Sequence, residues 1–317
     1  MISIQNVSVR YGDLLALDSL SLELEQGQVF GYIGPNGAGK STTMKVLACL
    51  LKADEGAASV DGHDVRSHPE RIRRIVGYMP DFLGVYDDLT VHEYLQFFCA
   101  AFSVPRPKRA ALIDSVLELT DLTEKKHEMV SGLSRGMQQR LGVARVLVHD
   151  PKVLLLDEPA SGLDPRARIE MRSLLMELQR MGKTIIVSSH ILSELHEMCS
   201  SIGIIERGKL LFAGTTQEAI EQAGAGERIA IRLESDAPRA AQVLAEDERV
   251  TSATVEEQGE GEVRERQEVL VELAPGRHSH HFLIEKLVGA GFRIDAFAPR
   301  SVKLEDVFLR ITKGQVQ

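Results

Sequence analysis

The residues best suited to chemistry form a glycine-rich run, Gly34-Pro35-Asn36-Gly37-Ala38-Gly39-Lys40-Ser41, which matches the pattern G-x-x-x-x-G-K-[ST]. Its glycines allow the backbone to turn so that successive N–H groups point inward. A triphosphate bound there would lie at a helix N-terminus, with Lys40 reaching the β and γ phosphates and Ser41 binding Mg²⁺. The alternative is a turn that binds nothing. A predicted strand before the run, 28–33, and a predicted helix after it, 41–51, favour the phosphate-binding interpretation.

Two adjacent carboxylates, Asp157 and Glu158, follow an apolar run at 153–156. The run predicts a buried strand, and α/β sheets place ligand chemistry at the carboxyl ends of their strands. One carboxylate there can hold Mg²⁺, directly or through water, and the next can orient an attacking water. The alternative is an acidic strand end that only caps the following turn. The phosphate loop earlier in the chain favours the metal-binding interpretation.

Four further residues have a structural explanation beside a chemical one: Tyr11, Ser134, Asp164 and His190. An isolated histidine is more often structural, but His190 ends a predicted strand, 184–189, that follows the acidic one. Asp164 stands before a proline and Ser134 before an amphipathic stretch, so both are natural N-caps. Tyr11 is either a core aromatic or a platform for a nucleobase.

The elements that must position these residues are short apolar strands that alternate with helical stretches from Met1 to about Gly214. This alternation predicts an α/β domain with a largely parallel sheet. The stretch at 89–149 departs from it. A capping box, Thr90-Val91-His92-Glu93, starts an amphipathic helix that ends by Pro105, and helices at about 108–119 and 134–148 follow. Residues 89–149 are therefore predicted to be a helical insertion.

A second pattern begins after a helix at 215–223 and a glycine-bearing joint at 224–226. Its predicted order is strand 228–233, helix 238–245, strands 250–255 and 268–273, helix 280–290 and strand 293–298. This is the split βαββαβ, or ferredoxin-like, plan. The charged run 256–266 is predicted to be a solvated hairpin loop. Two domains are expected, an α/β domain at 1–215 and a smaller α+β domain at 216–317.

Six motifs in this order resemble the ATP-binding cassette (ABC) ATPases over about residues 1–215. They are Tyr11, the phosphate loop, Tyr78-Met79-Pro80-Asp81, Leu133-Ser134-Arg135-Gly136-Met137-Gln138-Gln139-Arg140, Leu154-Leu155-Leu156-Asp157-Glu158-Pro159 with Ser161-Gly162-Leu163-Asp164, and His190. The resemblance implies a P-loop NTPase cassette that binds ATP and Mg²⁺ and hydrolyses the ATP.

The resemblance also implies roles for single residues. It implies that Glu158 is the general base and that Lys40 and His190 also act in catalysis, at the γ-phosphate. It further implies that the magnesium ligands are Ser41, Asp157 and Asp81. The nucleotide-binding set is Tyr11, Gly34, Pro35, Asn36, Gly37, Ala38, Gly39, Lys40, Ser41, Thr42, Asp81 and, from the other subunit of a dimer, Ser134 and Gly136. Asp164 is implied to act across the dimer in addition to capping its helix.

Two positions depart from the commonest family pattern. The signature usually reads LSGGQ, and here Arg135 and Met137 replace its second glycine and its glutamine. Asp81 stands where the family has a glutamine, so its side chain is shorter and adds a charge that could contact Mg²⁺ directly or through water. Similar variants, and a tail like residues 301–308, resemble a branch of ABC exporters for drugs, ions or polysaccharides.

Composition limits the partners. A net charge of −9 disfavours non-specific binding to nucleic acid, whose phosphates are held mainly by Lys and Arg, so no nucleic-acid partner is expected. Cys49, Cys99 and Cys199 show no metal-ligand spacing and indicate reduced thiols in a cytosolic protein. No signal peptide is recognisable, and no apolar run approaches the roughly 18 to 20 residues that span a bilayer. A membrane role therefore requires docking on another protein.

The expected function is an ATP-hydrolysing subunit that energises export by a polytopic membrane permease on a separate chain. We expect a second copy of the chain as the other partner, and a cytoplasmic location that is peripheral on the inner face of the membrane. The alternatives are a soluble ABC ATPase acting on ribosomes or DNA, and a small-molecule kinase. The apolar stretch 82–86, beside the acidic Asp81, Asp87 and Asp88, is either a small satellite core or a groove for a helix of the permease.

Overall fold

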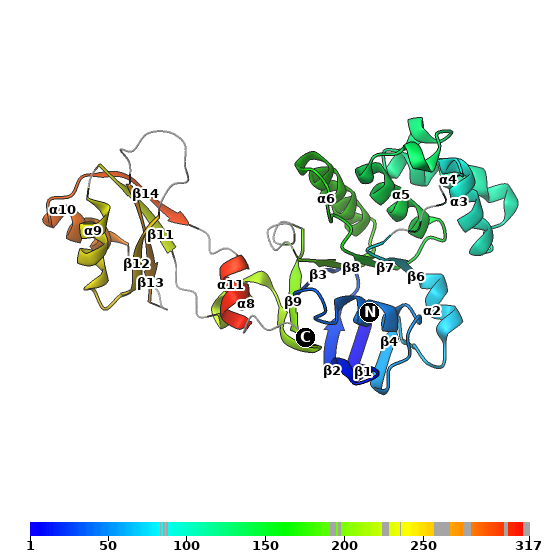
Figure 1. The fold of residues 1–317 in the computed structure, drawn as a ribbon, viewed down its shortest axis with the longest axis horizontal. Coiled ribbons are helices and arrows are strands. Elements are labelled where there is room, and N and C mark those ends of the chain that lie inside the picture. The colour runs from blue at the N-terminus through cyan, green and yellow to red at the C-terminus, as the bar shows by residue number, and fades with distance from the viewer. Residues whose placement is uncertain are drawn as a thin grey trace. The chain divides into compact units, whose positions relative to one another are not determined.

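The computed structural model describes residues 1–82, 84, 86, 88–190, 195, 198–223, 228–234, 236–256, 267–274, 280–300 and 304–312. It divides into two compact units, Met1–Thr216 with Thr312–Gln317, and Gln217–Ile311 (Figure 1). Each unit has its own cluster of buried apolar side chains. The predicted joint at 224–226 and most of the predicted hairpin loop at 256–266 lie outside the described residues.

The first unit is built on a six-stranded sheet with the order β10-β9-β3-β8-β7-β6. Its strands are β3 (Val29–Ile33), β6 (Val76–Met79), β7 (Val153–Asp157), β8 (Thr184–Ser189), β9 (Ser201–Glu206) and β10 (Lys209–Gly214). The strands β9, β3, β8, β7 and β6 are parallel, and β10 pairs antiparallel with β9. Strands β3, β7 and β8 are buried along their whole length, which explains their near-continuous apolar sequences. The prediction of an α/β domain with a parallel sheet is confirmed.

A second sheet of the same unit is antiparallel and has the order β2-β1-β4-β5. It comprises β1 (Ile2–Tyr11), β2 (Leu14–Leu24), β4 (Glu55–Val60) and β5 (His63–Asp64). One face of this sheet, with Ile4, Leu22 and Val60, shares its core with Phe30 and Leu155 of the parallel sheet. The alternation of strands and helices in the sequence did not predict this separate antiparallel sheet.

The helical insertion contains α3 (Val91–Ala101), α4 (Arg106–Leu119) and α5 (Arg135–Leu147), grouped together in Figure 1, with short 3-10 turns at Thr123–Lys125 and Val130–Gly132. The predicted capping box is present: the Thr90 backbone N–H donates to Glu93 Oε2 at 2.9 Å, and the Glu93 N–H donates to Thr90 Oγ1 at 3.2 Å. The other helices of the unit are α2 (Pro69–Ile75) and α6 (Pro165–Arg180). No helix in the described ranges is long and apolar enough to cross a membrane.

The helix after the phosphate loop is shorter than predicted. The sequence placed it at 41–51, but α1 spans Lys40–Leu47. Cys49 adopts a left-handed φ of 57°, and the N–H groups of Leu50 and Leu51 both donate to the carbonyl of Lys45, which ends the helix. Leu50, placed on the buried face by its spacing, is 61% exposed. The helical spacing of apolar residues in the sequence therefore extends beyond the residue at which the helix ends.

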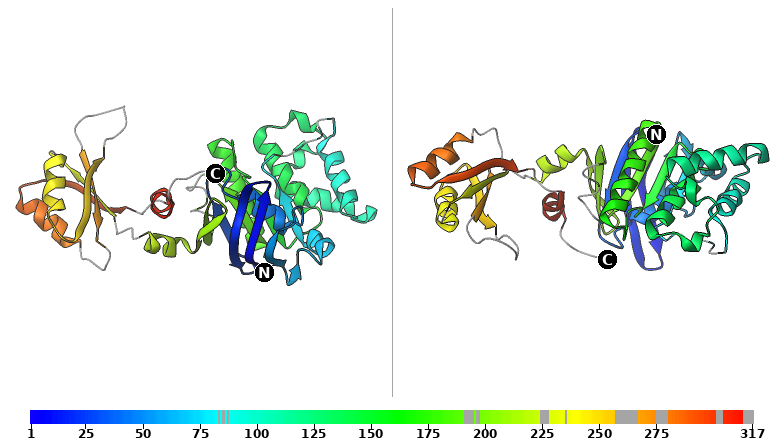
Figure 2. Two further views of the ribbon diagram at one scale, coloured as in Figure 1. Left: turned by 60° about the horizontal axis from the view of Figure 1, so that its bottom comes forward. Right: turned by 90° about the horizontal axis from the view of Figure 1, so that it is seen from above.

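The second unit contains β11 (Arg228–Leu233), α9 (Ala237–Ala245), β12 (Val250–Glu256), β13 (Gln267–Leu273), α10 (His281–Gly289) and β14 (Ile294–Arg300). Its sheet has the order β12-β13-β11-β14 with every neighbouring pair antiparallel, the ferredoxin-like arrangement that the sequence predicted. Helices α9 and α10 cover one face of this sheet (Figure 2). Helices α8 (Thr216–Gln222) and α11 (Leu304–Ile311) precede and follow it in the chain.

Candidate nucleotide site

The predicted phosphate loop connects β3 to α1. Gly39 is the N-cap of α1 and has a φ of 112°, a conformation that L side chains rarely adopt. A Cβ at this position would also lie 2.8 Å from the carbonyl oxygen of Ala16. The site therefore requires glycine here, and it places Lys40, Ser41 and Thr42 in the first turn of the helix, where free N–H groups favour an anion.

Lys40 is buried against the loop that precedes it. Its Nζ donates to the carbonyl oxygens of Gly34 at 2.5 Å and Pro35 at 3.2 Å. The same nitrogen lies 3.7 Å from Oε1 of Glu158. Burial lowers the pKa of Lys40, and the charges of the carboxylates around it, Glu158 foremost, act in the opposite direction. The structure thus brings the predicted phosphate-binding lysine and the predicted base together.

The two predicted carboxylates lie at the carboxyl end of β7, as expected. Asp157 is the last residue of the strand, and both it and Glu158 are buried. The hydroxyl of Ser188 on β8 donates to Asp157 Oδ1 at 2.6 Å and accepts the backbone N–H of Glu158 at 2.9 Å. Sequence reasoning missed Ser188. The signal was its place in the predicted strand 184–189, because the parallel register of β7 and β8 pairs it with Asp157.

His190 lies directly beyond β8, and its Nδ1 is 2.7 Å from Oε2 of Glu158. The other carboxylate oxygen, Oε1, is buried and accepts no hydrogen bond from the described residues. Glu158 therefore stands between a cation and an imidazole, with one oxygen available as an acceptor. That is the environment that a group removing a proton from water needs.

Three further side chains, Tyr11, Tyr78 and Asp81, belong to the predicted nucleotide-binding motifs. Tyr11 ends β1 and is 46% exposed, and Asp81 follows β6 and is exposed. Burial raises the pKa of Tyr78 to about 12, with further contributions from Asp157, Asp81 and Tyr11. The Tyr78 hydroxyl accepts and donates no hydrogen bond within the described part of the chain, and no role had been predicted for it.

The signature residues do not join this cluster. Ser134 is the N-cap of α5 and accepts the N–H of Met137 at 3.3 Å, and Gly136 lies close to Ala167 of α6. Among the described residues, no hydrogen bond or ion pair connects Ser134 or Gly136 to Lys40 or Glu158. Asp164 is the N-cap of α6, as predicted, and accepts the N–H of Ala167 at 3.0 Å.

The donor set suits magnesium. Ser41, Asp157 and Asp81 offer hard oxygen ligands, which Mg²⁺ prefers. Where the chain is described, no group of three or more His, Cys, Asp and Glu side chains could hold a metal by itself. That is expected for Mg²⁺, which usually takes one or two carboxylates and completes its shell with water and substrate phosphates. Ser188 donates its hydrogen bond to Oδ1 of the Asp157 carboxylate.

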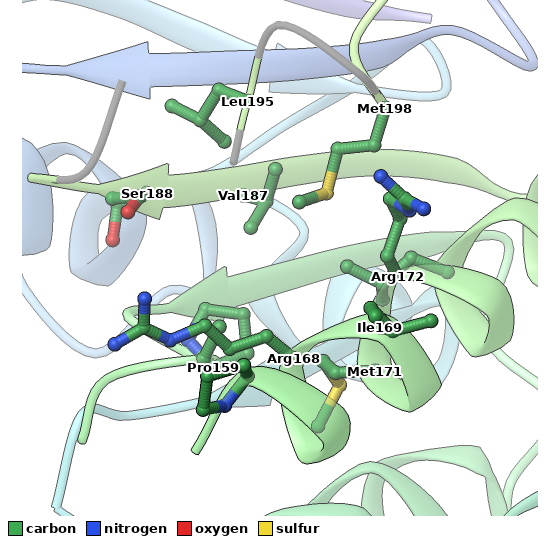
Figure 3. A pocket seen from close by; sticks show the side chains of 13 residues that line it. Pro159, Arg168, Ile169, Met171, Arg172, Val187, Ser188, Leu195 and Met198 are labelled. Carbon is green, nitrogen blue, oxygen red and sulfur yellow. The ribbon is translucent and has the colours of Figure 1, made fainter. Parts of the chain in front are cut away.

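A cavity of about 270 Å³ borders the strand that carries Ser188. Its lining is mainly apolar and comes from α6, from β8, from Pro159 and Ala160 after β7, and from Leu195 and Met198 after β8. Figure 3 shows Arg168 and Arg172 of α6 on one side of this cavity and Val187 and Ser188 of β8 on the other. The cavity lies behind the carboxylates rather than at the phosphate loop, so it is not the nucleotide site.

Comparison with known proteins is in agreement with this geometry. The family profile described as ABC transporter matches residues 17–161. The Nod factor export ATP-binding protein I of Burkholderia orbicola is 40% identical over 69% of this chain and 72% of its own length. The protein of the same description from Ralstonia nicotianae is 33% identical over 100% of this chain and 95% of its own length.

A solved structure agrees as well. The dimeric structure of a bacterial ABC transporter cassette superposes with a TM-score of 0.62 at 25% identity, covering 68% of this chain and 98% of the other. The relatives named above are transport proteins, so an ATPase of ribosomes or DNA and a small-molecule kinase are not favoured. The chain belongs to the family of ABC transporter ATP-binding subunits, and it binds and hydrolyses ATP to energise a transporter.

Proposed function

We propose that Glu158 is the general base of ATP hydrolysis in this chain. The observation that carries the proposal is the position of its carboxylate, with Lys40 Nζ 3.7 Å from one oxygen and His190 Nδ1 2.7 Å from the other. Glu158 takes a proton from water as the water oxygen attacks the γ-phosphorus, and ADP departs as the bond to the γ-phosphate breaks. Lys40 and His190 stabilise the charge that develops on the transferred group.

Magnesium belongs to the same proposal. Asp157, Ser41 and Asp81 supply its protein ligands, and the bound ion neutralises charge on the β and γ phosphates. The loop of residues 34–42 binds the phosphates through its N–H groups, and the exposed face of Tyr11 stacks on the base. Asp81 would hold the metal directly or, because its side chain is shorter than that of glutamine, through a water.

The catalytic unit is proposed to be a dimer of two cassettes, each formed by residues 1–215. Ser134 and Gly136 lie outside the cluster of Lys40 and Glu158, yet they begin a helix whose first turn contains no acidic side chain. An anion at that end is favourable. We therefore place the γ-phosphate of ATP bound by one copy against Ser134 and Gly136 of the other, with Asp164 at the same junction. The related cassette named above is dimeric.

The transport direction is proposed to be export, by a polytopic permease on a separate chain, since two relatives are described as export proteins. The subunit would then be cytoplasmic and peripheral on the inner face of the membrane. Residues 216–317 form an accessory domain in this proposal.

The surface proposed to receive the permease is an exposed aromatic patch formed by Phe82, Tyr86 and Phe97. Phe82 is 84% exposed and Tyr86 is 51% exposed. The Tyr86 ring lies 5.5 Å from that of Phe97 and 6.3 Å from that of Tyr94, so it is anchored on α3 while one side faces solvent. Leu83, Val85 and Asp87 lie outside the described residues. Phe82→Asp and Tyr86→Asp should release the subunit from permease-containing membranes, whereas Leu309→Asp in the second unit should not.

The test of the catalytic proposal is Glu158→Gln, which keeps the shape but removes the proton acceptor. Steady-state hydrolysis should fall by about 100-fold or more, while ATP binding persists and an ATP-dependent dimer accumulates. The matched control is Glu177→Gln, an exposed carboxylate of α6, which should hydrolyse ATP normally. Near-normal turnover by Glu158→Gln would contradict the proposal.

A further inference from the structure

Ser188 occupies a central position at the carboxyl end of the parallel sheet. It is fully buried, and the registers of β3, β8 and β7 place it between Tyr32 and Asp157. The neighbouring positions on the same face, Ile186 and Leu155, are core residues. A hydroxyl in such surroundings is unfavourable unless its hydrogen bonds are satisfied. The chain satisfies them with two groups, both from the predicted catalytic segment.

The two bonds fix the direction of the hydroxyl proton. Ser188 Oγ is 2.6 Å from Asp157 Oδ1 and 2.9 Å from the backbone nitrogen of Glu158. An ionised carboxylate only accepts and a backbone N–H only donates, so the Ser188 proton must point to Asp157 and its lone pair to Glu158. A single oxygen therefore connects the side chain of one carboxylate residue to the backbone of the next.

The backbone of Glu158 is strained where this contact is made. Its φ of 52° lies in the left-handed region, which a non-glycine residue adopts only when its surroundings enforce it. This conformation directs the side chain toward Lys40 and His190. Among the described residues, the Glu158 N–H donates to Ser188 Oγ and the Glu158 carbonyl accepts the N–H of Ser161 at 3.1 Å, so the hydroxyl is one of two contacts that hold the turn.

We propose that Ser188 is a positioning residue for ATP hydrolysis. Its hydroxyl orients Asp157 toward the metal and holds Glu158 in the left-handed conformation that places its carboxylate beside the attacking water. The inference rests on the roles proposed above for Asp157 and Glu158. Because no hydrogen bond or ion pair among the described residues joins Ser188 to Lys40 or to the phosphate loop, its effect falls on turnover and on the magnesium requirement, not on ATP binding.

The experiment compares Ser188→Ala and Ser188→Thr with a matched control, Thr120→Ala. Thr120 is also a buried hydroxyl, and it donates to Val116 O at 2.7 Å within the helical insertion. The measurements are kcat, the KM for ATP, the Mg²⁺ concentration at half-maximal rate, ATP binding and thermal unfolding. Ser188→Ala should lose about 10- to 100-fold in kcat and require more Mg²⁺, with ATP binding retained. Ser188→Thr, which restores a hydroxyl, should recover much of the rate, and Thr120→Ala should affect unfolding alone.

Each outcome decides the matter. A kcat and Mg²⁺ midpoint of Ser188→Ala within about twofold of the natural protein would overturn the inference. Parallel loss of ATP binding and hydrolysis in a Ser188→Ala variant that unfolds at the same temperature as the natural protein would also overturn it. If Ser188→Ala does not fold, Ser188→Cys, with its weaker S–H donor, should show the same loss of kcat with ATP binding kept. Glu158→Gln separates the two proposals. Normal turnover in that variant would contradict the assignment of Glu158 as the base. A defect in Ser188→Ala alone bears on the positioning role of Ser188 and not on that assignment.

Discussion

Two helix N-termini in the first unit differ in how completely the chain surrounds them. The start of α1 is enclosed: Lys40 bonds two loop carbonyls, and Glu158 lies within 3.7 Å of its charge. At the start of α5, the Met137 N–H donates to Ser134 Oγ at 3.3 Å, Arg135 and Gly136 pack against Gly162 and Ala167, and the first turn has no acidic residue. Arg135 even adds a positive charge there, where the helix dipole disfavours it.

The difference shows which half of a nucleotide site this chain builds alone. Buried, mutually bonded groups at α1 define one face of a site within a single copy. The α5 end has the donors and the charge for an anion, but its contacts among the described residues are local. In the dimer proposed above, another copy of the chain supplies the second face, and variants at either helix start can test this.

The largest expected effect comes from disabling one end in each of two copies. Lys40→Ala should lose phosphate binding, and Ser134→Arg should block the approach of the partner's phosphate, so each variant alone should lose about 100-fold or more in hydrolysis. Mixed in equal amounts, they can form heterodimers with at most one complete site. ATP hydrolysis measured across mixing ratios should show partial recovery.

The reverse result would also be clear. If hydrolysis by the natural protein is strictly proportional to its concentration down to high dilution, and no ATP-dependent dimer forms in solution, the second face is not supplied by another copy. The difference between the contacts at the starts of α1 and α5 would then be one of packing alone.

A smaller effect distinguishes capping from chemistry at α5. Ser134→Ala and Thr90→Ala each remove an N-cap hydroxyl, so each should lower the free energy of unfolding by about 1 kcal/mol. Only Ser134→Ala should also reduce ATP hydrolysis, because Thr90 caps α3 away from the nucleotide. Chemical denaturation measures the first quantity and steady-state turnover the second. Equal turnover in the two variants would reduce Ser134 to a structural cap.

The sequence reveals the residues of the predicted chemistry more readily than the buried serine that bonds to two of them. Lys40, Asp157, Glu158 and His190 lie at the phosphate loop and at strand ends, where their motifs placed them, because the apolar runs of those strands are unmistakable; their catalytic roles stay predictions. Ser188 was not predicted, because its function comes from strand register, and which residue of β8 faces Asp157 is decided by pairing across 31 positions of the chain.

The fold shows the same limit. The βαββαβ order of the second unit was correct because each of its elements has a local period and a local stop signal. The antiparallel sheet β2-β1-β4-β5 was missed because local pattern reveals strands and not their partners. The end of α1 was misplaced because Cys49 adopts a left-handed turn that glycine or asparagine would have signalled, and cysteine does not.

An effect of similar size on the free energy of unfolding is expected where the start of α5 meets the loop before α6. Gly162 has a φ of 67°, and a Cβ there would lie 2.4 Å from the Arg135 guanidinium carbon. Gly162→Ala should therefore cost about 1 kcal/mol from the left-handed backbone alone, with a further loss as Arg135 is displaced. Denaturation of Arg135→Ala, Gly162→Ala and the double variant separates the two parts, because the displacement is absent when Arg135 is already gone. Strict additivity would show that the guanidinium moves freely.

The smallest effect concerns the connection between the helical insertion that carries α5 and the sheet that carries the phosphate loop. His149 stacks on Phe102 with ring centroids 3.9 Å apart, and its Nε2 is 3.0 Å from the carbonyl oxygen of Val76 on β6. Burial lowers the pKa of His149, so the folded protein favours the neutral ring.

Because the folded pKa is the lower one, the stabilising contribution of His149 is present above its unfolded pKa of about 6.5 and is lost as the pH falls through the folded value. The free energy of unfolding should decline on acidification below about pH 6.5, and His149→Phe, which can keep the stack but cannot titrate, should show a shallower decline. His281→Gln, at an exposed position in the second unit, is the control and should keep the natural slope. Denaturation series at several pH values measure all three proteins. If the unfolding free energy of His149→Phe declines as steeply with falling pH as that of the natural protein, protonation of His149 does not couple the helical insertion to the sheet. The insertion with α5 and the sheet with the phosphate loop would then be held together by packing alone.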